Sequence, residues 1–169
     1  MRSSTYVIMG VSGSGKTTIG AALARALAIP FLEGDELHPP ANVQRMAQGV
    51  PLTDDDRRPW LLAIAQQLRD AKRGGLGLVV ACSALKRSYR DLLRSAGGAD
   101  LQFVHLAADQ TTIAERLAGR RGHFMPASLL ESQFATLEEP ASDERAWVCD
   151  VRETPESIVK SLVTRAREQ

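Results

Sequence analysis

Polar and apolar residues alternate along this chain in two patterns. Short, almost wholly apolar runs are typical of buried strands. This character is shared by the segments Tyr6–Met9, Phe31–Leu32, Leu76–Cys82, Leu101–Leu106 and Ala146–Val151. Other segments repeat apolar residues at helical spacing, as Lys16–Leu27 does. Strands that alternate with helices predict a parallel sheet with right-handed crossovers, and therefore a three-layer α/β fold.

Local signals also predict where helices begin. Three pairs have the composition of a helix start: Thr53 with Asp56, Ser128 with Glu131, and Thr154 with Pro155. The first two pairs have capping-box spacing, and the third combines an N-cap residue with a proline at the first helical position. We expect the first of these helices to run towards Ala71 and the last to lie near the end of the chain.

Composition narrows the classes of protein to which the chain can belong. Its 169 residues suffice for one domain, over 1–169, and are too few for two ordinary ones. Apolar residues make up 44% and charged residues 24%, as in soluble globular proteins. The formal net charge of +1 gives no support to binding of nucleic acid or membrane. Cys82 and Cys149 have no metal-ligand spacing, so we expect buried, reduced thiols in a cytoplasmic protein.

The clearest chemical signal is a glycine-rich motif between the first strand and the first helix. It fits G-x-x-x-x-G-K-[ST] with the residues Gly10, Val11, Ser12, Gly13, Ser14, Gly15, Lys16 and Thr17. Such a loop cradles phosphate groups with its backbone N–H groups and with the helix N-terminus. We expect Lys16 to reach the β- and γ-phosphates of ATP and Thr17 to contact Mg²⁺.

Two classes of P-loop protein fit the chain poorly. Switch GTPases carry an N-K-x-D motif, which this sequence lacks. Motor-type ATPases carry an acidic residue at the end of the third strand, where this chain has Ser83. A small kinase remains the best interpretation.

Charged residues beyond the second and third strands are candidates for an acceptor site. Asp35 follows the second strand and can orient an acceptor hydroxyl and take its proton, while Glu33 can hold a water bound to Mg²⁺. Arg57, Lys86 and Arg90 can together form a pocket for an anion. Each of these residues is also compatible with a solvated loop or helix start.

A later basic segment resembles a lid. It contains Arg116, Arg120, Arg121 and His123, with glycines between them. Closing over the phosphates, it would neutralise charge in the transition state and exclude water. The alternative is a solvated helix end. His105 lies in a predicted strand and is expected in the core, whereas His38 and His123 lie in loops near the proposed site.

Several motifs, in order along nearly the whole chain, resemble the bacterial gluconokinase family. Beyond the phosphate loop they are E-G-D leading to His38, P-L-T-D-D-D-R from Pro51, C-S-A-L-K from Cys82, and G-H-F-M from Gly122 through Ser132-Gln133-Phe134. The resemblance implies ATP-dependent phosphorylation of D-gluconate to 6-phospho-D-gluconate. It also implies a five-stranded parallel sheet, a mobile lid near 118–128, and a cytoplasmic homodimer.

The resemblance also implies roles for individual residues. Lys16, Thr18 and the loop amides would hold the nucleotide phosphates, and Arg121 would act in catalysis. Asp35 would position the acceptor hydroxyl. Gluconate would be bound by a set of residues comprising Asp35, His38, Arg57, Lys86, Arg90 and His123. Adenine would lie between Arg116 or Arg120 and the loop at Pro155. A kinase for another small acceptor, such as shikimate or a nucleotide, and a nucleotide-binding module without turnover remain as alternatives.

Overall fold

The computed structural model describes residues 4–119 and 127–169, which form a three-layer α/β fold around a parallel sheet. Its strands pair in the order β2-β3-β1-β4-β5. They span Thr5–Met9 (β1), Phe31–Glu33 (β2), Leu78–Ala81 (β3), Leu101–Ala107 (β4) and Ala146–Asp150 (β5). The predicted five-stranded parallel sheet is thereby confirmed.

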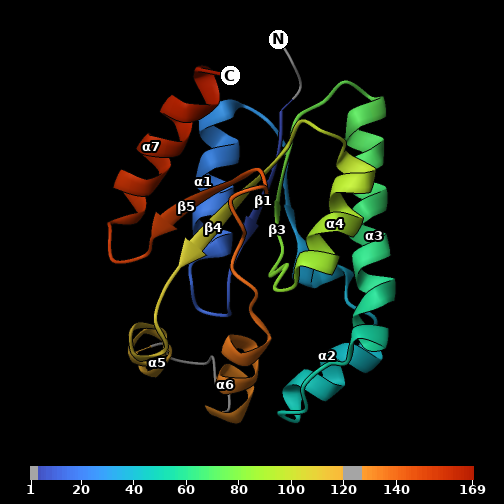
Figure 1. Cartoon of the computed structure of the whole chain (residues 1–169), viewed down its shortest axis with the longest axis vertical. Coiled ribbons are helices and arrows are strands. Elements are labelled where there is room, and N and C mark those ends of the chain that lie inside the picture. The colour runs from blue at the N-terminus through green and yellow to red at the C-terminus, as the bar shows by residue number, and fades with distance from the viewer. Residues whose placement is uncertain (1–3, 120–126) are drawn as a thin grey trace.

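Helices cover both faces of this sheet. They span Lys16–Leu27 (α1), Pro40–Ala47 (α2), Asp54–Arg73 (α3), Arg87–Gly97 (α4), Gln110–Ala118 (α5), Ala127–Thr136 (α6) and Pro155–Arg167 (α7), with a 3₁₀ turn over Gly34–Leu37 (η1). In Figure 1, α1 and α7 lie on one face, and α3 and α4 lie on the other. The helices α2, α5 and α6 lie beyond the carboxyl ends of the strands, where ligands bind in open α/β sheets.

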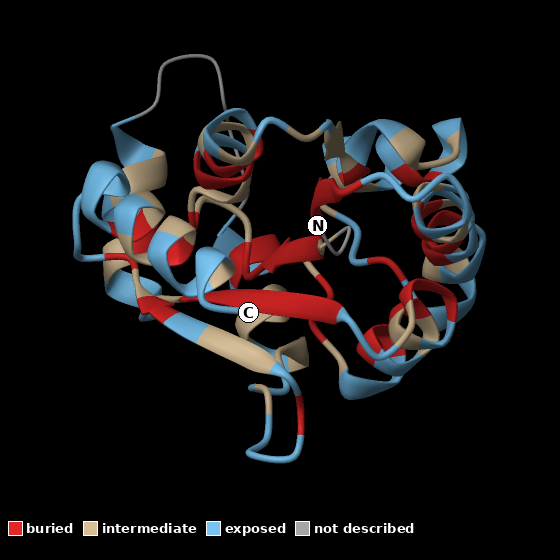
Figure 2. Cartoon of the chain, turned by 90° about the horizontal axis from the view of Figure 1, so that it is seen from above, coloured by how far each residue is buried: buried red, intermediate tan, exposed pale blue. Residues whose placement is uncertain are grey.

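Two apolar layers hold the helices to the sheet. Between the sheet and α3 and α4 lie Trp60, Ile64 and Leu93, all almost fully buried. Between the sheet and α1 and α7 lie Leu23 and Leu162, which are fully buried. Viewed from above, the strands are largely buried and the helices turn exposed residues outward (Figure 2). Burial of this apolar surface is the main stabilising contribution to the fold.

Two of the three predicted helix starts are confirmed and one is wrong. Thr53 and Asp56 form a complete capping box at α3, with backbone-to-side-chain distances of 3.1 and 2.9 Å. Thr154 caps α7 by accepting from the Ser157 N–H at 3.2 Å. The predicted start at Ser128 is wrong, because α6 already contains Ala127. A capping-box spacing also occurs inside helices, where exposed Ser and Glu are common.

The remaining predictions concern the lid, the two cysteines and the number of domains. The predicted lid at 118–128 falls mostly on residues 120–126, which lie outside the described residues. Cys82 and Cys149 are free and buried, as expected. Within residues 4–119 and 127–169, no helix combines the length and apolar character that a membrane crossing requires. The assignment of 1–169 to one domain stays a prediction.

Candidate active site

The turn between β1 and α1 has the geometry of a phosphate-binding loop. Gly13 and Gly15 have φ values of 80° and 99°, in the left-handed region that glycine adopts without strain. Gly15 caps α1, so the N–H groups of the first helical turn face the loop at the positive end of the helix dipole. Lys16 Nζ donates to the carbonyl of Val11 at 3.0 Å, which holds the ammonium group against the loop.

Two cavities share this loop as a wall. The larger has a volume of about 280 Å³ and is lined in part by Ser12, Lys16, Asp35, His38, Arg57 and Gln133. The smaller has a volume of about 240 Å³ and is lined in part by Ser14, Gly15, Thr18, Arg116, Val151 and Pro155. Molecules bound in the two cavities would therefore meet at the phosphate loop, with the Lys16 side facing the larger cavity.

The smaller cavity brings together Arg116 and Pro155, two of the residues predicted to enclose adenine. Arg116 on α5 donates a hydrogen bond to the carbonyl of Val151, just before α7. Pro155, the first residue of α7, lines the same cavity. The buried hydroxyl of Ser14 has no hydrogen-bond partner among the described residues. An unpaired buried hydroxyl at a phosphate loop fits a polar ligand there.

Glu33, the last residue of β2, and Asp35 are held in place by the glycine between them. A Cβ atom at Gly34 would lie 2.3 Å from the carbonyl oxygen of Ala81, so only glycine fits. The indole N–H of buried Trp60 donates to the Gly34 carbonyl at 2.8 Å. As a result, Glu33 points toward the phosphate loop and Asp35 lines the larger cavity.

Thr17 and Glu33 form a pair of oxygen donors beside the loop. The Thr17 hydroxyl donates a hydrogen bond to the Glu33 carboxylate. Among residues 4–119 and 127–169, no cluster of three or more His, Cys, Asp or Glu side chains can hold a metal by itself. A site with few protein oxygen ligands suits Mg²⁺, because this ion keeps several of its waters and is held largely through the phosphates of the nucleotide.

His38 is a half-buried, neutral residue of the larger cavity. Its ring stacks on Trp60 with centroids 4.1 Å apart, and Asn42 Nδ2 lies 3.3 Å from its Nδ1. Asn42 Nδ2 also donates to the carbonyl of Asp56. Because an amide NH₂ group only donates, Nδ1 accepts and Nε2 carries the proton of the neutral ring. Burial and, second, the charge of Arg57 lower the pKa of His38 to about 4.

We expect an NMR titration of the His38 ring to show a midpoint near pH 4. The ring then stays uncharged through the physiological range, since its pKa lies below the usual 6.5. In the Arg57→Ala variant the midpoint should rise but stay below 6.5, because burial is the larger cause. A midpoint near 6.5 in the wild-type protein would contradict this environment.

Arg57 extends from α3 into the larger cavity, and a hydrogen bond to Tyr89 holds its side chain in place. Its Nη1 donates to the Tyr89 hydroxyl at 2.9 Å, and this hydroxyl donates in turn to Asp54. Lys86 Nζ lies 2.9 Å from the Asp54 carboxylate, and it does not line the cavity. Hydrogen bonds from Tyr89 and Lys86 lower the pKa of Asp54. Lys86 therefore supports Arg57 through Asp54 and Tyr89. A direct contact between Lys86 and a substrate stays a prediction.

The structure corrects the prediction for Arg90. This side chain is fully buried, and its guanidinium binds both oxygens of Glu144 at 2.7 and 3.0 Å. It also donates to the carbonyl of Ala84 at 2.9 Å. A buried and fully engaged arginine cannot bind a substrate in the cavity. Arg90 instead supports the loop after β3, which runs beside the phosphate loop through the Gly10–Ser83 backbone hydrogen bond.

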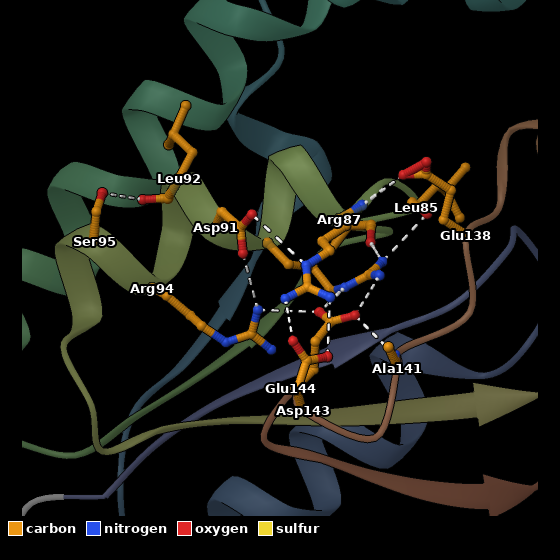
Figure 3. A network of polar contacts seen from close by, with 12 residues as sticks. Leu85, Arg87, Asp91, Leu92, Arg94, Ser95, Glu138, Ala141, Asp143 and Glu144 are labelled. Atoms are coloured by element: carbon orange, nitrogen blue, oxygen red, sulfur yellow. Dashed lines mark hydrogen bonds and ion pairs between the residues drawn. The ribbon is translucent and has the colours of Figure 1, made fainter.

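The chain segment after α6 is fastened to α4 around Glu144 (Figure 3). Arg94 also donates to Glu144, at 3.0 Å. At the start of α4, the backbone N–H of Arg87 donates to the Glu138 carboxylate at 3.0 Å. The Arg87 guanidinium pairs with Asp143. These contacts fix the segment between α6 and β5 relative to α4.

Some predicted residues are not placed here, and some residues of the site were not predicted. Arg120, Arg121 and His123 lie outside the described residues. The sequence predicts no role for Tyr89 or Gln133. Tyr89 supports Arg57, and Gln133 lines the larger cavity. Gln133 belongs to a motif named above, but nothing in the sequence alone assigns either residue a chemical role.

Comparisons with known proteins agree with this geometry. Residues 6–140 match the family model described as AAA domain. The chain is 51% identical over 159 residues to a gluconokinase of Gluconobacter oxydans, covering 93% of this chain and 88% of that protein. It is 45% identical to the thermoresistant gluconokinase of Escherichia coli, covering 94% and 90%. The crystal structure of a gluconokinase from Sinorhizobium meliloti matches with a TM-score of 0.89 at 48% identity, covering 99% and 95%.

Proposed function

This chain belongs to the gluconokinase family of P-loop kinases, and on that premise we propose that it transfers the γ-phosphoryl group of Mg-ATP to the C6 hydroxyl of D-gluconate. It is an ATP-dependent kinase whose acceptor is an alcohol group. The proposal is carried by the two cavities that share the phosphate loop. A nucleotide in the smaller cavity would direct its phosphates along the loop towards an acceptor in the larger one.

The nucleotide side follows from the smaller cavity. Arg116 and Pro155 would enclose the adenine, because a guanidinium plane and a proline ring both pack well on an aromatic ring. The loop amides would bind the phosphates, and Lys16 would balance their negative charge. Thr17 and Glu33 would hold Mg²⁺ and one of its waters. When bound, Mg²⁺ neutralises charge on the phosphates.

The acceptor side combines one base with several donors. Asp35 lines the larger cavity beside Lys16 and would take the proton of the reacting hydroxyl. Arg57 would bind the gluconate carboxylate, since guanidinium groups match carboxylates bidentately. Neutral His38 would donate to a hydroxyl through Nε2. A polyol acid needs this combination of one cation and several neutral hydrogen-bonding groups.

Replacing Arg57 by alanine should raise KM for D-gluconate by about tenfold or more, because a charge-assisted hydrogen bond is lost. KM for ATP should change much less, since Arg57 does not line the smaller cavity. Arg58→Ala, on the exposed side of α3, is the matched control and should behave as the wild type. A larger rise in KM for ATP than for gluconate would assign Arg57 to the nucleotide.

The proposed function is tested by ADP release from Mg-ATP with a panel of acceptors: D-gluconate, shikimate, AMP, glucose and none. We expect turnover with D-gluconate alone. Turnover with shikimate or AMP would favour another small-molecule kinase. ATP binding without acceptor-dependent ADP release would favour a nucleotide-binding module.

Two further properties are proposed from the family resemblance alone. These are a homodimeric assembly and a cytoplasmic location. Light scattering on the purified protein at working concentration tests the first, with twice the mass of one chain as the expected result. Cell fractionation tests the second.

A further inference from the structure

Gln133 connects helix α6 to the phosphate loop. The backbone N–H of Ser12 donates to Gln133 Oε1 at 2.6 Å, across 121 positions of sequence. Apolar packing supports this contact, because Val11 of the loop and Leu130 of α6 share one buried cluster with Leu85. The position of Gln133 is therefore fixed by its helix and by the loop together.

The contact with Ser12 also fixes which way the carboxamide faces. A backbone N–H can only donate, so the atom that it meets must be the carbonyl oxygen of the side chain. The NH₂ group then lies at the other end of the carboxamide. No residue within 4–119 and 127–169 accepts a hydrogen bond from it. The geometry leaves a rigidly held pair of N–H donors on a side chain that lines the larger cavity.

The larger cavity otherwise takes its polar groups from different elements. Asp35 and His38 come from η1 and the residue after it, and Arg57 comes from α3. Gln133 adds a neutral donor from α6, next to the phosphate loop. An acceptor with oxygens along its whole length can contact Gln133 and the residues from η1 and α3 at the same time.

We propose that Gln133 binds the acceptor directly, with its NH₂ group donating to a hydroxyl or carboxylate oxygen while its Oε1 stays bound to Ser12. This inference rests on the proposed function and deepens it by adding a residue that determines acceptor specificity. It ties the acceptor to the loop that carries the phosphates, so that the acceptor is positioned relative to the phosphoryl donor. Positioning of this kind raises the rate of a reaction between two bound molecules.

The test is the Gln133→Met variant, which keeps the length of the side chain and removes both polar atoms. KM for D-gluconate should rise about tenfold, as expected when one hydrogen bond to substrate is lost, and KM for ATP should stay within about twofold. The matched control is Gln67→Met, at an exposed position of α3, which should behave as the wild type. Equal increases in KM for both substrates, or no increase for either, would overturn the inference.

A second measurement separates direct binding from an effect on the loop. Wild type and Gln133→Met are compared on D-gluconate, on D-gluconamide and on the monodeoxy-D-gluconates. If Gln133 binds the acceptor, the two proteins should use at least one analogue equally well, namely one that lacks the contacted oxygen. If the ratio of KM values between the two proteins is the same for every analogue, Gln133 only stabilises the loop and the inference is wrong. A wild-type protein inactive on gluconate would instead refute the proposed function.

Discussion

Replacing Lys16 by alanine is expected to lower kcat with D-gluconate by about 10²–10³-fold, the usual cost of removing one charge-stabilising donor. Lys16 is the cation of the phosphate loop and lines the cavity in which the acceptor is proposed to bind. Its ammonium group is held 3.0 Å from the Val11 carbonyl, at the loop itself. Charge that develops on the transferred phosphoryl group would lose the cation of the phosphate loop.

The measurement is steady-state ADP release, with a control for charge alone. Lys72→Ala removes an exposed lysine at the end of α3 that lies away from the phosphate loop (Figure 1). This control should keep wild-type kcat. Circular dichroism should show both variants folded. Activity of Lys16→Ala close to that of the wild type would mean that the loop does not act on the transferred phosphate.

Replacing Glu144 by glutamine should lower the free energy of unfolding by about 3–5 kcal/mol, as when one partner of a buried ion pair is removed. The Glu144 side chain is 1% exposed and binds Arg90, which is 0% exposed. Without the carboxylate, Arg90 keeps a buried charge that nothing balances. A loss of this size is a large share of the stability of a small domain. Urea unfolding followed by circular dichroism measures it.

The matched control is Asp143→Asn, in the neighbouring residue. Its pair with Arg87 is exposed, with side chains 63% and 45% accessible, and should contribute less than about 1 kcal/mol. If both variants lost the same stability, burial would not govern the strength of these pairs.

The effect of Glu144 should also depend on pH. Burial raises the pKa of Glu144, but hydrogen bonds from Arg90, Ala141 and Arg94 outweigh it and lower the pKa from 4.5 to about 2. Its folded pKa lies below the unfolded one, so its contribution is complete above pH 4.5 and is lost as the pH falls towards 2. The stability difference between wild type and Glu144→Gln should therefore shrink over this range.

The sequence predicts the sheet well because its parallel strands leave a simple pattern. Each is a short apolar run, and the predicted and observed ends differ by at most two residues. Helices with weak apolar stripes are harder to predict. The segment Pro40–Ala47 is short and mostly exposed, with Asn42 as its one buried residue. Its position depends on hydrogen bonds to α3, which no local pattern reveals.

The phosphate loop is predictable because its chemistry requires particular residues at fixed spacing. Arg90 shows the limit of such reasoning. A basic residue after a strand suggests a ligand contact, but Arg90 lies on the buried side of α4 with Tyr89 and Leu93. Its partner Glu144 is 54 residues away, so the ion pair exists only in the folded chain. Gln133 was missed for the same reason, since its partner Ser12 belongs to the other end of the sequence.

The most direct test of the proposed reaction is the structure of the product, measured by ³¹P NMR after the purified protein reacts with Mg-ATP and D-gluconate. We predict one new phosphomonoester signal whose phosphorus couples to the two protons of C6, growing in step with ADP. A phosphate on another hydroxyl, or release of inorganic phosphate alone, would contradict the proposed arrangement of acceptor and phosphate loop.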